Sequence, residues 1–386
     1  MIFTLAINNY RSVLNLAIPL GSLNLITGPN GSGKSNIYRA LRLLAETAQG
    51  GVVQALAQEG GLSSTFWAGP ETISKAMLKG EVAVEGQVRK ERKRMRMGFA
   101  TDEFGYAISL GLPAPSSSAF SLDPEIKREC IWAGPYYRPA SLLVDRRGPL
   151  VKVRSGRHFD VVSQHLNIFE SLFNQIGSLE HTPEIIRMRE FICNWRFYDH
   201  FRTDRDAAAR RAQLGTRTPV LHHDGHDVAA ALQTIREIGD SHALDEAFSD
   251  AFPGAKLTII QHGEGYLSLA ISQHGLLRPL SCAEFSDGTL RYVLLLAALL
   301  TPRPPSLMIL NEPETSLHPD LLPALARLIL RASENTQIWV VSHAERLINL
   351  LQEQPGCNVI KLEKQLGKTE LQGQDRLDAP GWYWPD

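Results

Sequence analysis

The stretch GPNGSGKS, from Gly28 to Ser35, is the most specific motif in the sequence. It matches the pattern G-x-x-x-x-G-K-[ST] at every position. The motif is preceded by LNLIT, which is typical of a short apolar strand. It is followed by NIYRALRLL, whose apolar residues have helical spacing. Glycines let the backbone curl so that successive N–H groups point into one concavity, which holds phosphate oxygens. The start of the following helix adds its positive dipole end. The sequence therefore predicts a site for a nucleoside triphosphate.

Residue types within this loop have different expected roles. Lys34 would reach the β- and γ-phosphates, and the hydroxyl of Ser35 would bind Mg²⁺. A glycine turn that merely joins a strand to a helix is the alternative interpretation. The predicted nucleotide-binding residues are Asn30, Gly31, Ser32, Gly33, Lys34 and Ser35.

Length and composition are ordinary for a globular protein. The 386 residues are 44% hydrophobic and 21% charged, with a net charge of −1. The longest apolar run, Tyr292 to Leu300, is far shorter than the roughly 20 residues of a membrane helix, and the N-terminus lacks a signal-peptide layout. The four cysteines form no CxxC pair, so neither a zinc site nor a disulfide framework is predicted. We expect a cytoplasmic protein with no membrane partner.

Two more buried strands are predicted near the C-terminus, and each ends beside a candidate catalytic residue. In LMILNEPE, from Leu307 to Glu314, an apolar strand delivers Glu312, which is placed to orient or deprotonate the water that attacks the γ-phosphate. In IWVVSH, from Ile338 to His343, the histidine follows a strand in the same way. A surface acidic turn and a structural histidine are the alternatives for each motif alone.

A fourth motif, FSDGTL from Phe285 to Leu290, stands at the start of a predicted buried helix. A serine and a glycine there can offer a hydroxyl, an N–H group and a helix dipole to phosphate. Capping of the helix by Ser286 or Asp287 explains the same residues equally well.

Together and in this order, the four motifs resemble the ABC-type ATPases of the RecF/SMC-like branch, and especially stand-alone bacterial ATPases with phrases such as SDGTLR and EPETSLHP. The likeness is firm over residues 1–50 and 281–362, and loose between them. It implies a Walker A loop at 28–35, a Walker B strand at 307–312, a signature at FSDGT, a D-loop at 316–318 and His343 as switch histidine. Gln54 or Gln58 would be the Q-loop glutamine, and the spacing does not choose between them.

The resemblance implies that two protomers enclose two ATP molecules, each site pairing the Walker A loop of one with the signature of the other. Ser286 and Gly288 would then act in trans, ATP and Mg²⁺ would be the cofactors, and hydrolysis would release the homodimer.

Two residues depart from the family pattern. Asn311 replaces the Walker B aspartate that helps to hold Mg²⁺ through water, and an amide supplies no charge. We still expect Ser35 and Asn311 at the metal, with Glu314 as a candidate source of the missing charge. Asp287 replaces the first signature glycine, and its carboxylate would repel the phosphates unless it turns away to cap its helix.

The order of elements predicts an α/β fold, with an ABC-type P-loop NTPase core, an appended antiparallel sheet and a largely helical insertion. The core would be split between residues 1–156 and 253–386, with the sheet at about 80–156. The insertion would span 157–252. Its predicted helices are Phe159–Ile176, Pro183–His200, Asp227–Ile238 and Ala243–Phe252.

Two polar stretches suggest further ligands. The basic run from Arg89 to Arg96 could contact nucleic acid through Arg92, Lys93 and Arg94, although a charged hairpin edge explains it as well. The stretch HHDGHD, from His222 to Asp227, matches no known zinc or iron spacing. We expect a polar turn there, with diverging side chains and no metal.

These features predict an ATP-hydrolysing ATPase that dimerises on ATP and acts in DNA maintenance and repair or in anti-phage defence, with DNA or an effector protein as partner. The alternative is a nucleotide-gated protein-interaction module with slow or no turnover, which Asn311 favours. A membrane-transport subunit is disfavoured, because FSDGT and EPETSLHP depart from transporter signatures and the insertion is too large. Any nuclease activity would come from another chain, since only a short tail follows His343.

Overall fold

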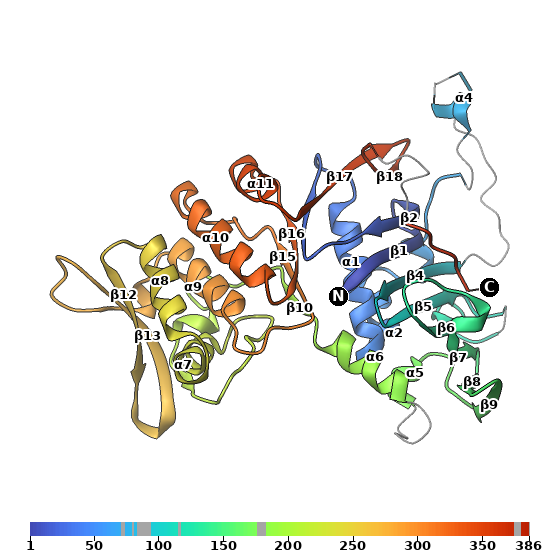
Figure 1. Ribbon diagram of the computed structural model, residues 1–386, viewed down its shortest axis with the longest axis horizontal. Helices are drawn as coiled ribbons and strands as arrows, with labels where there is room; N and C mark the ends of the chain where they lie inside the picture. Colours follow the sequence, from blue (N-terminus) through green and yellow to red (C-terminus); the bar gives the residue numbers. More distant parts are fainter. Residues whose placement is uncertain are drawn as a thin grey trace. The chain divides into compact units, whose positions relative to one another are not determined.

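The computed structural model describes residues 1–70, 74–78, 81–82, 94–114, 117–175, 183–373 and 380–385. The chain divides into two units, and each combines distant parts of the sequence (Figure 1). The first unit holds residues 1–21, 28–195 and 360–386. The second holds residues 22–27 and 196–359.

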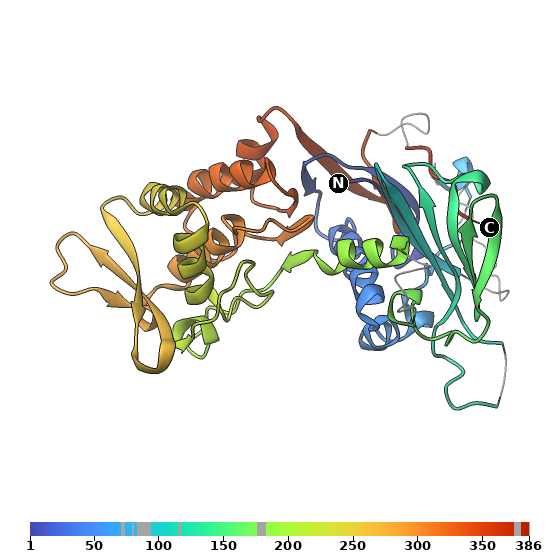
Figure 2. The ribbon, with the colours of Figure 1, turned by 60° about the horizontal axis from the view of Figure 1, so that its bottom comes forward.

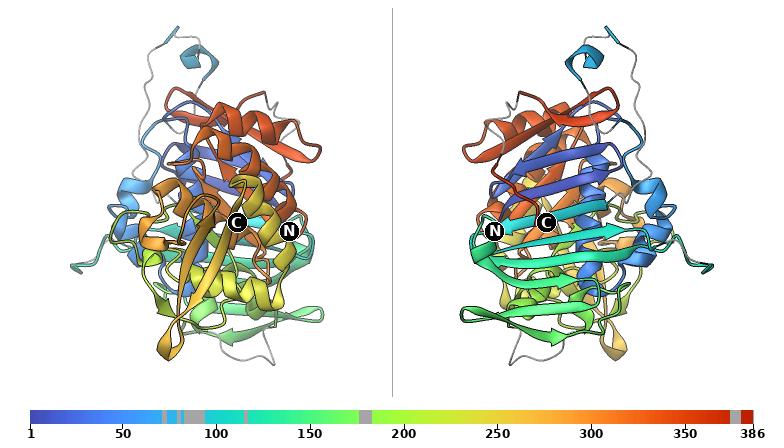
Figure 3. Two further views of the ribbon diagram at one scale, coloured as in Figure 1. Left: turned by 90° about the vertical axis from the view of Figure 1, so that its left-hand side faces the viewer. Right: turned by 90° about the vertical axis from the view of Figure 1, so that its right-hand side faces the viewer.

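An eight-stranded antiparallel sheet is the centre of the first unit (Figure 3). The strand order is β2-β1-β4-β5-β6-β7-β8-β9, and the middle strands are buried along most of their length. The predicted antiparallel sheet is therefore confirmed. Its strands are β1 (Ile2–Tyr10), β2 (Val13–Pro19), β4 (Arg94–Thr101), β5 (Phe104–Gly111), β6 (Glu125–Ala133), β7 (Leu142–Arg147), β8 (Leu150–Ser155) and β9 (His158–Ser163).

Helix α1 (Lys34–Gln49) lies against β1 and β4 of this sheet (Figure 2). Its buried residues recur at helical spacing, as predicted from the sequence, and Gly50 ends it in the left-handed conformation. Three helices pack against α1, namely α2 (Val52–Gln58), α5 (Leu172–Gln175) and α6 (Pro183–Cys193). The short helices α3 (Leu62–Thr65) and α4 (Lys75–Leu78) complete the helices described in this unit.

The predicted helix at Phe159–Ile176 is wrong over its first part. Strand β9 pairs there with β8 in a hairpin whose turn contains Gly156 at a φ of 62°. The β-branched pair Val161-Val162 favours the extended backbone. In the part of this stretch that the structure describes, residues 159–175, the only helix is α5. Residues 157–252 also do not form one compact body, because 157–195 belong to the first unit and 196–252 to the second.

A buried ion pair joins β6 to β7. Glu129 and Arg146 are both fully buried, with 2.8 Å between Glu129 Oε2 and Arg146 Nη1. Glu129 also accepts hydrogen bonds from the Tyr106 hydroxyl and from the Ser171 hydroxyl, at 2.8 and 2.6 Å. Arg146 donates further hydrogen bonds to the backbone carbonyls of Gly148, Asn167 and Glu170. Both charges are therefore compensated, as burial requires.

Parallel strands form the centre of the second unit, in the order β10-β15-β16-β3. Strands β3, β15 and β16 are almost wholly buried, as expected of apolar runs in a parallel sheet. Helix α10 contacts β16, α11 contacts β3, and α9 packs among α7, α8 and α10. The strands are β3 (Leu23–Thr27), β10 (Arg196–Tyr198), β15 (Leu307–Asn311) and β16 (Gln337–Val341); the helices are α7 (Val228–Ile238), α8 (Ser241–Ala251), α9 (Asp287–Leu299), α10 (Leu322–Ser333) and α11 (Glu345–Gln352).

A small antiparallel sheet completes the second unit, and its β12–β13 hairpin extends beyond α7 and α8 (Figure 1). A hairpin near the C-terminus joins the two units along the chain: β17 (Cys357–Gln365) begins in the second unit, enters the first and pairs with β18 (Lys368–Leu371). No helix among the described residues is long and apolar enough to span a membrane. The small sheet consists of β11 (Gln213–Leu214), β12 (Ala255–Gln261), β13 (Tyr266–Gln273) and β14 (Leu280–Ser281).

The buried ion pair gives a stability prediction. Replacing Glu129 by alanine leaves the Arg146 charge buried without its partner, so we expect Glu129→Ala to lower the free energy of unfolding by about 3–5 kcal/mol. Urea unfolding followed by circular dichroism measures this. Asp204→Ala, which breaks an exposed ion pair with Arg202, is the control and should change little. A loss below about 1 kcal/mol for Glu129→Ala would show that the network does not stabilise the sheet.

Candidate nucleotide-binding site

The predicted phosphate loop begins where β3 ends and runs into α1. Gly28, Gly31 and Gly33 have φ angles of 147°, 80° and 108°, which residues with a side chain rarely adopt. Gly33 is the N-cap of α1, and the ammonium group of Lys34 folds back over the loop. It donates hydrogen bonds to the carbonyls of Gly28 and Pro29, at 2.6 and 3.2 Å. The loop thus has the curled backbone on which the predicted phosphate binding depends.

Two of these glycines are also required by the close approach of the β17–β18 hairpin. A Cβ atom on Gly28 would lie 2.4 Å from the Leu362 carbonyl oxygen, and one on Gly33 would lie 2.1 Å from Thr369 Oγ1. The Thr369 hydroxyl donates to the carbonyl of Ser32 at 2.9 Å, which holds the hairpin against the loop. A Cβ atom on Gly31, by contrast, would have no neighbouring atom within 4 Å among the described residues. The hairpin therefore supports the shape of the loop at both of its ends.

The predicted catalytic residues of the second unit lie together at the carboxyl end of its parallel sheet. Glu312 follows β15 with a left-handed φ of 49°, and its N–H group donates to the carbonyl of Val341 on β16 at 2.8 Å. His343 follows β16, and its Nδ1 atom is 3.5 Å from Glu312 Oε1. Both side chains are about half exposed. A carboxylate and an imidazole that share one solvent-accessible edge are suited to proton transfer and to contact with phosphate.

Glu314 is buried beside this pair. Its Oε1 atom accepts hydrogen bonds from the Ser342 hydroxyl, and from the N–H groups of His343 and Ala344, at 2.7, 3.2 and 3.3 Å. Its Oε2 atom is buried with no hydrogen-bond partner among the described residues. Glu314 therefore fixes the segment that carries His343. Oxygen donors of this kind also suit Mg²⁺, so the carboxylates fit the ion that the motif implies even though Asn311 carries no charge.

Arg291 of α9 contacts the same turn, and sequence reasoning missed it. Its Nη2 atom donates to the carbonyl of Glu312 at 3.1 Å, and the residue is buried. Burial lowers the pKa of the Arg291 guanidinium, while the nearby carboxylates of Glu314 and Glu312 act in the opposite direction. An arginine one turn into a predicted helix was the only available sequence signal.

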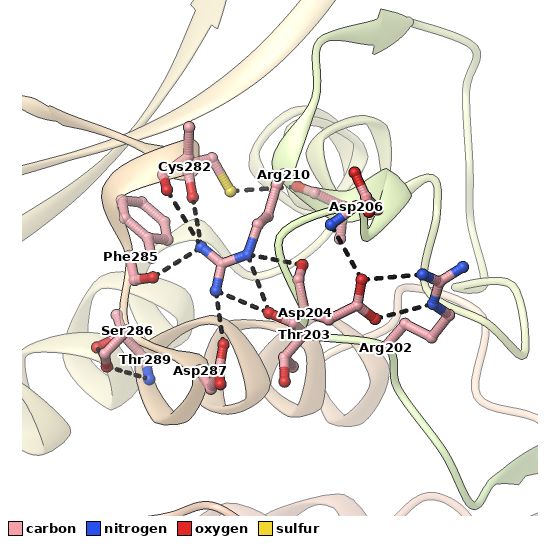
Figure 4. A network of polar contacts seen from close by, with 12 residues as sticks. Arg202, Thr203, Asp204, Asp206, Arg210, Cys282, Phe285, Ser286, Asp287 and Thr289 are labelled. Carbon is pink, nitrogen blue, oxygen red and sulfur yellow. Dashed lines mark hydrogen bonds and ion pairs between the residues drawn. The ribbon is translucent and has the colours of Figure 1, made fainter.

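The FSDGT segment forms the start of α9, where Ser286 and Asp287 are exposed and Phe285 is buried. The Ser286 hydroxyl caps the helix by accepting from the N–H group of Thr289 at 3.1 Å. Asp287 does not cap the helix and instead forms an ion pair with Arg210, at 2.8 Å (Figure 4). A Cβ atom on Gly288 would lie 2.7 Å from the Ser316 carbonyl oxygen, so this segment lies against the predicted D-loop of its own chain. Of the two candidate caps that the sequence offers, Ser286 caps the helix and Asp287 does not.

Comparison with known proteins agrees with this architecture. Residues 23–349 match the family described as "AAA domain, putative AbiEii toxin, Type IV TA system". The chain belongs to this family. No curated protein matches it.

Solved structures similar to this AAA-domain chain include three SMC head domains. One, bound to the C-winged helix domain of ScpA, is 14% identical over 96% of both chains, with a TM-score of 0.50. A second, with an extended coiled coil and bound to the C-terminal domain of ScpA derived from Pyrococcus furiosus, is 13% identical over 96% of this chain and 95% of that one, with a TM-score of 0.49. The Thermotoga maritima head domain is 14% identical over 96% and 97%, with a TM-score of 0.43. The first likeness confirms the predicted ABC-type P-loop ATPase fold.

For several residues with a predicted role, the structure does not decide whether the prediction is right. Gln54 and Gln58 both lie exposed on α2, so the choice of a Q-loop glutamine stays open. Arg94 is exposed at the start of β4. Arg92 and Lys93 lie outside the described residues.

The histidine-rich stretch is a polar turn before α7, but the expected divergence of its side chains is wrong. His222 Nδ1 and His226 Nδ1 lie 2.8 and 2.6 Å from the same oxygen, Asp224 Oδ1, which also accepts from the N–H group of His226 at 3.0 Å. Partial burial raises the pKa of Asp224, but the hydrogen bonds from His226 and His222 outweigh it and lower that pKa to about 2. The three ligand-type atoms lie within 4.8 Å of one another, a spacing at which they could hold a metal ion, so the expectation of no metal here stays a prediction.

The packing of the phosphate loop gives a prediction with a matched control. Gly33→Ala introduces both a strained φ and a clash with Thr369, whereas Gly31→Ala introduces only the strained φ. We expect Gly33→Ala to lower the free energy of unfolding by about 1–3 kcal/mol more than Gly31→Ala does, and to weaken ATP binding more. Thermal unfolding and titration with a fluorescent ATP analogue measure the two effects. Equal losses in the two variants would show that the β17–β18 hairpin does not constrain the loop.

Proposed function

We propose that this protein is a Mg²⁺-dependent ATPase that dimerises on ATP. The placement of Glu312 beside His343, at the carboxyl end of the parallel strands, carries the proposal. The same sheet contains β3, and the phosphate loop directly follows β3 in the chain. A loop that binds phosphate and an acid–base pair at strand ends are the two parts that ATP hydrolysis requires.

Each residue then has a role that its chemistry supports. The N–H groups of residues 30–35 and the ammonium of Lys34 bind the phosphates. Glu312 accepts a proton from the attacking water, and His343 contacts the γ-phosphate. Ser35 and Asn311 are the proposed contacts of Mg²⁺, which when bound neutralises charge on the β- and γ-phosphates. Glu314 keeps His343 in position through the hydrogen bonds described above.

The signature segment supports dimerisation. Ser286 and Asp287 are exposed, so the start of α9 is accessible to a ligand held by another molecule. We propose that Ser286 and Gly288 act on the ATP bound by a second copy of this chain. The first N–H groups of a helix have no partner within it, and they suit an anionic ligand.

The biological setting is part of the proposal. We place the activity in DNA maintenance and repair or in anti-phage defence, with DNA contacted through the region of Arg92, Lys93 and Arg94. The defence role is favoured by the family description, which names a toxin. The solved SMC heads are recorded with ScpA domains, and by analogy we propose an effector protein as a partner here. The cytoplasm is the proposed location.

A nucleotide-gated interaction module with slow or no turnover is the second candidate. Asn311 favours it, because an amide in place of a carboxylate gives less compensation of the Mg²⁺ charge. In this case the ATP-bound dimer itself would be the signal to a partner protein.

The Glu312→Gln variant tests the proposal. It removes the proton acceptor but keeps the size of the side chain, so we expect turnover to fall by about 10²–10⁴-fold and an ATP-bound dimer to accumulate. Phosphate release and light scattering after size exclusion measure the two effects, with and without double- and single-stranded DNA. Glu353→Gln, at the exposed end of α11, is the control.

The outcomes separate the candidates. Unchanged turnover in Glu312→Gln would remove Glu312 from catalysis, and a monomer at saturating ATP would contradict dimerisation. Wild-type turnover that is slow and indifferent to DNA, together with an ATP-bound dimer, would favour the interaction module.

A further inference from the structure

A single buried arginine shapes the segment that leads into α9. Arg210 ends the short helical turn Ala208–Arg210, 77 positions before Asp287, and only 8% of its side chain is exposed. Figure 4 shows its guanidinium between this turn and the signature segment. Its Nη1 atom donates to the carbonyls of Phe285, Cys282 and Ala283, at 2.7, 3.2 and 3.4 Å. Its Nε and Nη2 atoms donate to the carbonyl of Thr203, at 3.0 and 2.8 Å.

The same guanidinium holds the unusual acid of the signature. Arg210 Nη2 lies 2.8 Å from Asp287 Oδ1, although 61% of the Asp287 side chain is exposed. An exposed carboxylate is thus paired with a buried, fully hydrogen-bonded cation, which cannot swing away into solvent. A lysine has neither the planar fork nor enough donors to make these contacts at once.

The short helical turn that ends at Arg210 is fixed to the turn at Cys282–Glu284. The Cys282 thiol donates to the carbonyl of Ala209 at 3.1 Å. Burial raises the pKa of the Cys282 thiol to about 12, so the group is protonated at neutral pH and remains a donor. The turn at Cys282–Glu284 is closed by a capping box between Ser281 and Glu284. Arg210 is therefore held in place before any ligand arrives.

A negative charge at the start of α9 creates a conflict. It suits the positive end of the helix dipole, but it opposes a phosphate that approaches the same N–H groups. Ser286 already caps the helix, so Asp287 is not needed for capping. The ion pair with Arg210 compensates the negative charge of Asp287 and holds its carboxylate against its own chain.

We propose that Arg210 is a positioning residue of the signature, which neutralises and holds Asp287 so that the start of α9 accepts the triphosphate of an ATP bound by a second copy of the chain. This inference rests on the proposed function of Ser286 and Gly288 in trans. The guanidinium acts through Asp287 and the 282–285 carbonyls, and it does not itself need to touch the nucleotide.

A double-mutant cycle on ATP-driven dimerisation tests this role. In the Glu312→Gln background, the dimerisation constant at saturating Mg·ATP is measured by analytical ultracentrifugation for Arg210→Ala, Asp287→Asn and the double variant. Because Arg210→Ala leaves Asp287 uncompensated, we expect it to weaken dimerisation by about tenfold or more. Asp287→Asn alone should dimerise at least as tightly as the parent, and the double variant should recover most of the loss.

Two controls make the readout specific. Arg202→Ala removes an exposed arginine that pairs with Asp204 in the same loop, and it should leave dimerisation unchanged. ATP binding by the monomeric forms should be equal in all variants, since the signature acts in trans. Circular dichroism establishes that each variant is folded.

Three results would overturn the inference. Unchanged dimerisation in Arg210→Ala would show that Asp287 needs no compensation. If Asp287→Asn weakens dimerisation as much as Arg210→Ala does, the ion pair acts by holding the structure and not by neutralising the charge of Asp287. The same conclusion follows if Asp287→Asn does not restore dimerisation to a folded Arg210→Ala variant. A parent variant that stays monomeric with ATP would instead refute the proposed dimer, and this inference with it.

Discussion

In-register pairing of three parallel strands is the constraint on which the rest of the candidate site depends. Leu25 of β3, Val340 of β16 and Leu310 of β15 lie opposite one another, so the three strands end at one edge. Glu312 and His343, which follow β15 and β16, are therefore brought to the same edge of the second unit. Burial of nearly every strand residue fixes this register, because a shift by one residue would move each side chain to the other face.

Polar contacts then fix the backbone segments that follow these strands. Glu314 joins the turn after β15 to the segment after β16, and Arg291 joins the same turn to α9. In the first unit, Thr369 supports the phosphate loop through a hydrogen bond to the backbone. Arg291 and Thr369 lie outside the four sequence motifs, whereas Glu314 is the last residue of the LMILNEPE motif. All three side chains hold backbone segments of the candidate site in place, and such preorganisation reduces the rearrangement that a ligand would require on binding.

Local patterns in the sequence were sufficient to predict many helices and strands, but not the side-chain contacts between them. The buried strands and the start of α1 were predictable, because apolar runs, capping glycines and the phosphate-loop pattern are local signals. The pairing of Arg210 with Asp287 was not predictable, since it joins residues 77 positions apart, and a basic loop residue gives no sign of its partner. Strand β9 was predicted as helix for a related reason. Its extended conformation depends on pairing with β8, and a short sequence pattern does not show that pairing. The convergence on Asp224 likewise depends on a turn geometry that spacing alone does not specify.

Binding of Mg·ATP by the wild-type protein and by Lys34→Ala is the decisive measurement for the phosphate loop. We expect saturable binding by the wild type and a loss of at least about tenfold in affinity in the variant, because a charge-assisted contact to phosphate is removed. Isothermal titration calorimetry gives both affinities, with Lys256→Ala on the exposed face of β12 as the charge-matched control. Equal affinities for wild type and Lys34→Ala would contradict the assignment of residues 28–35 as the phosphate-binding loop, and with it the function proposed for this fold.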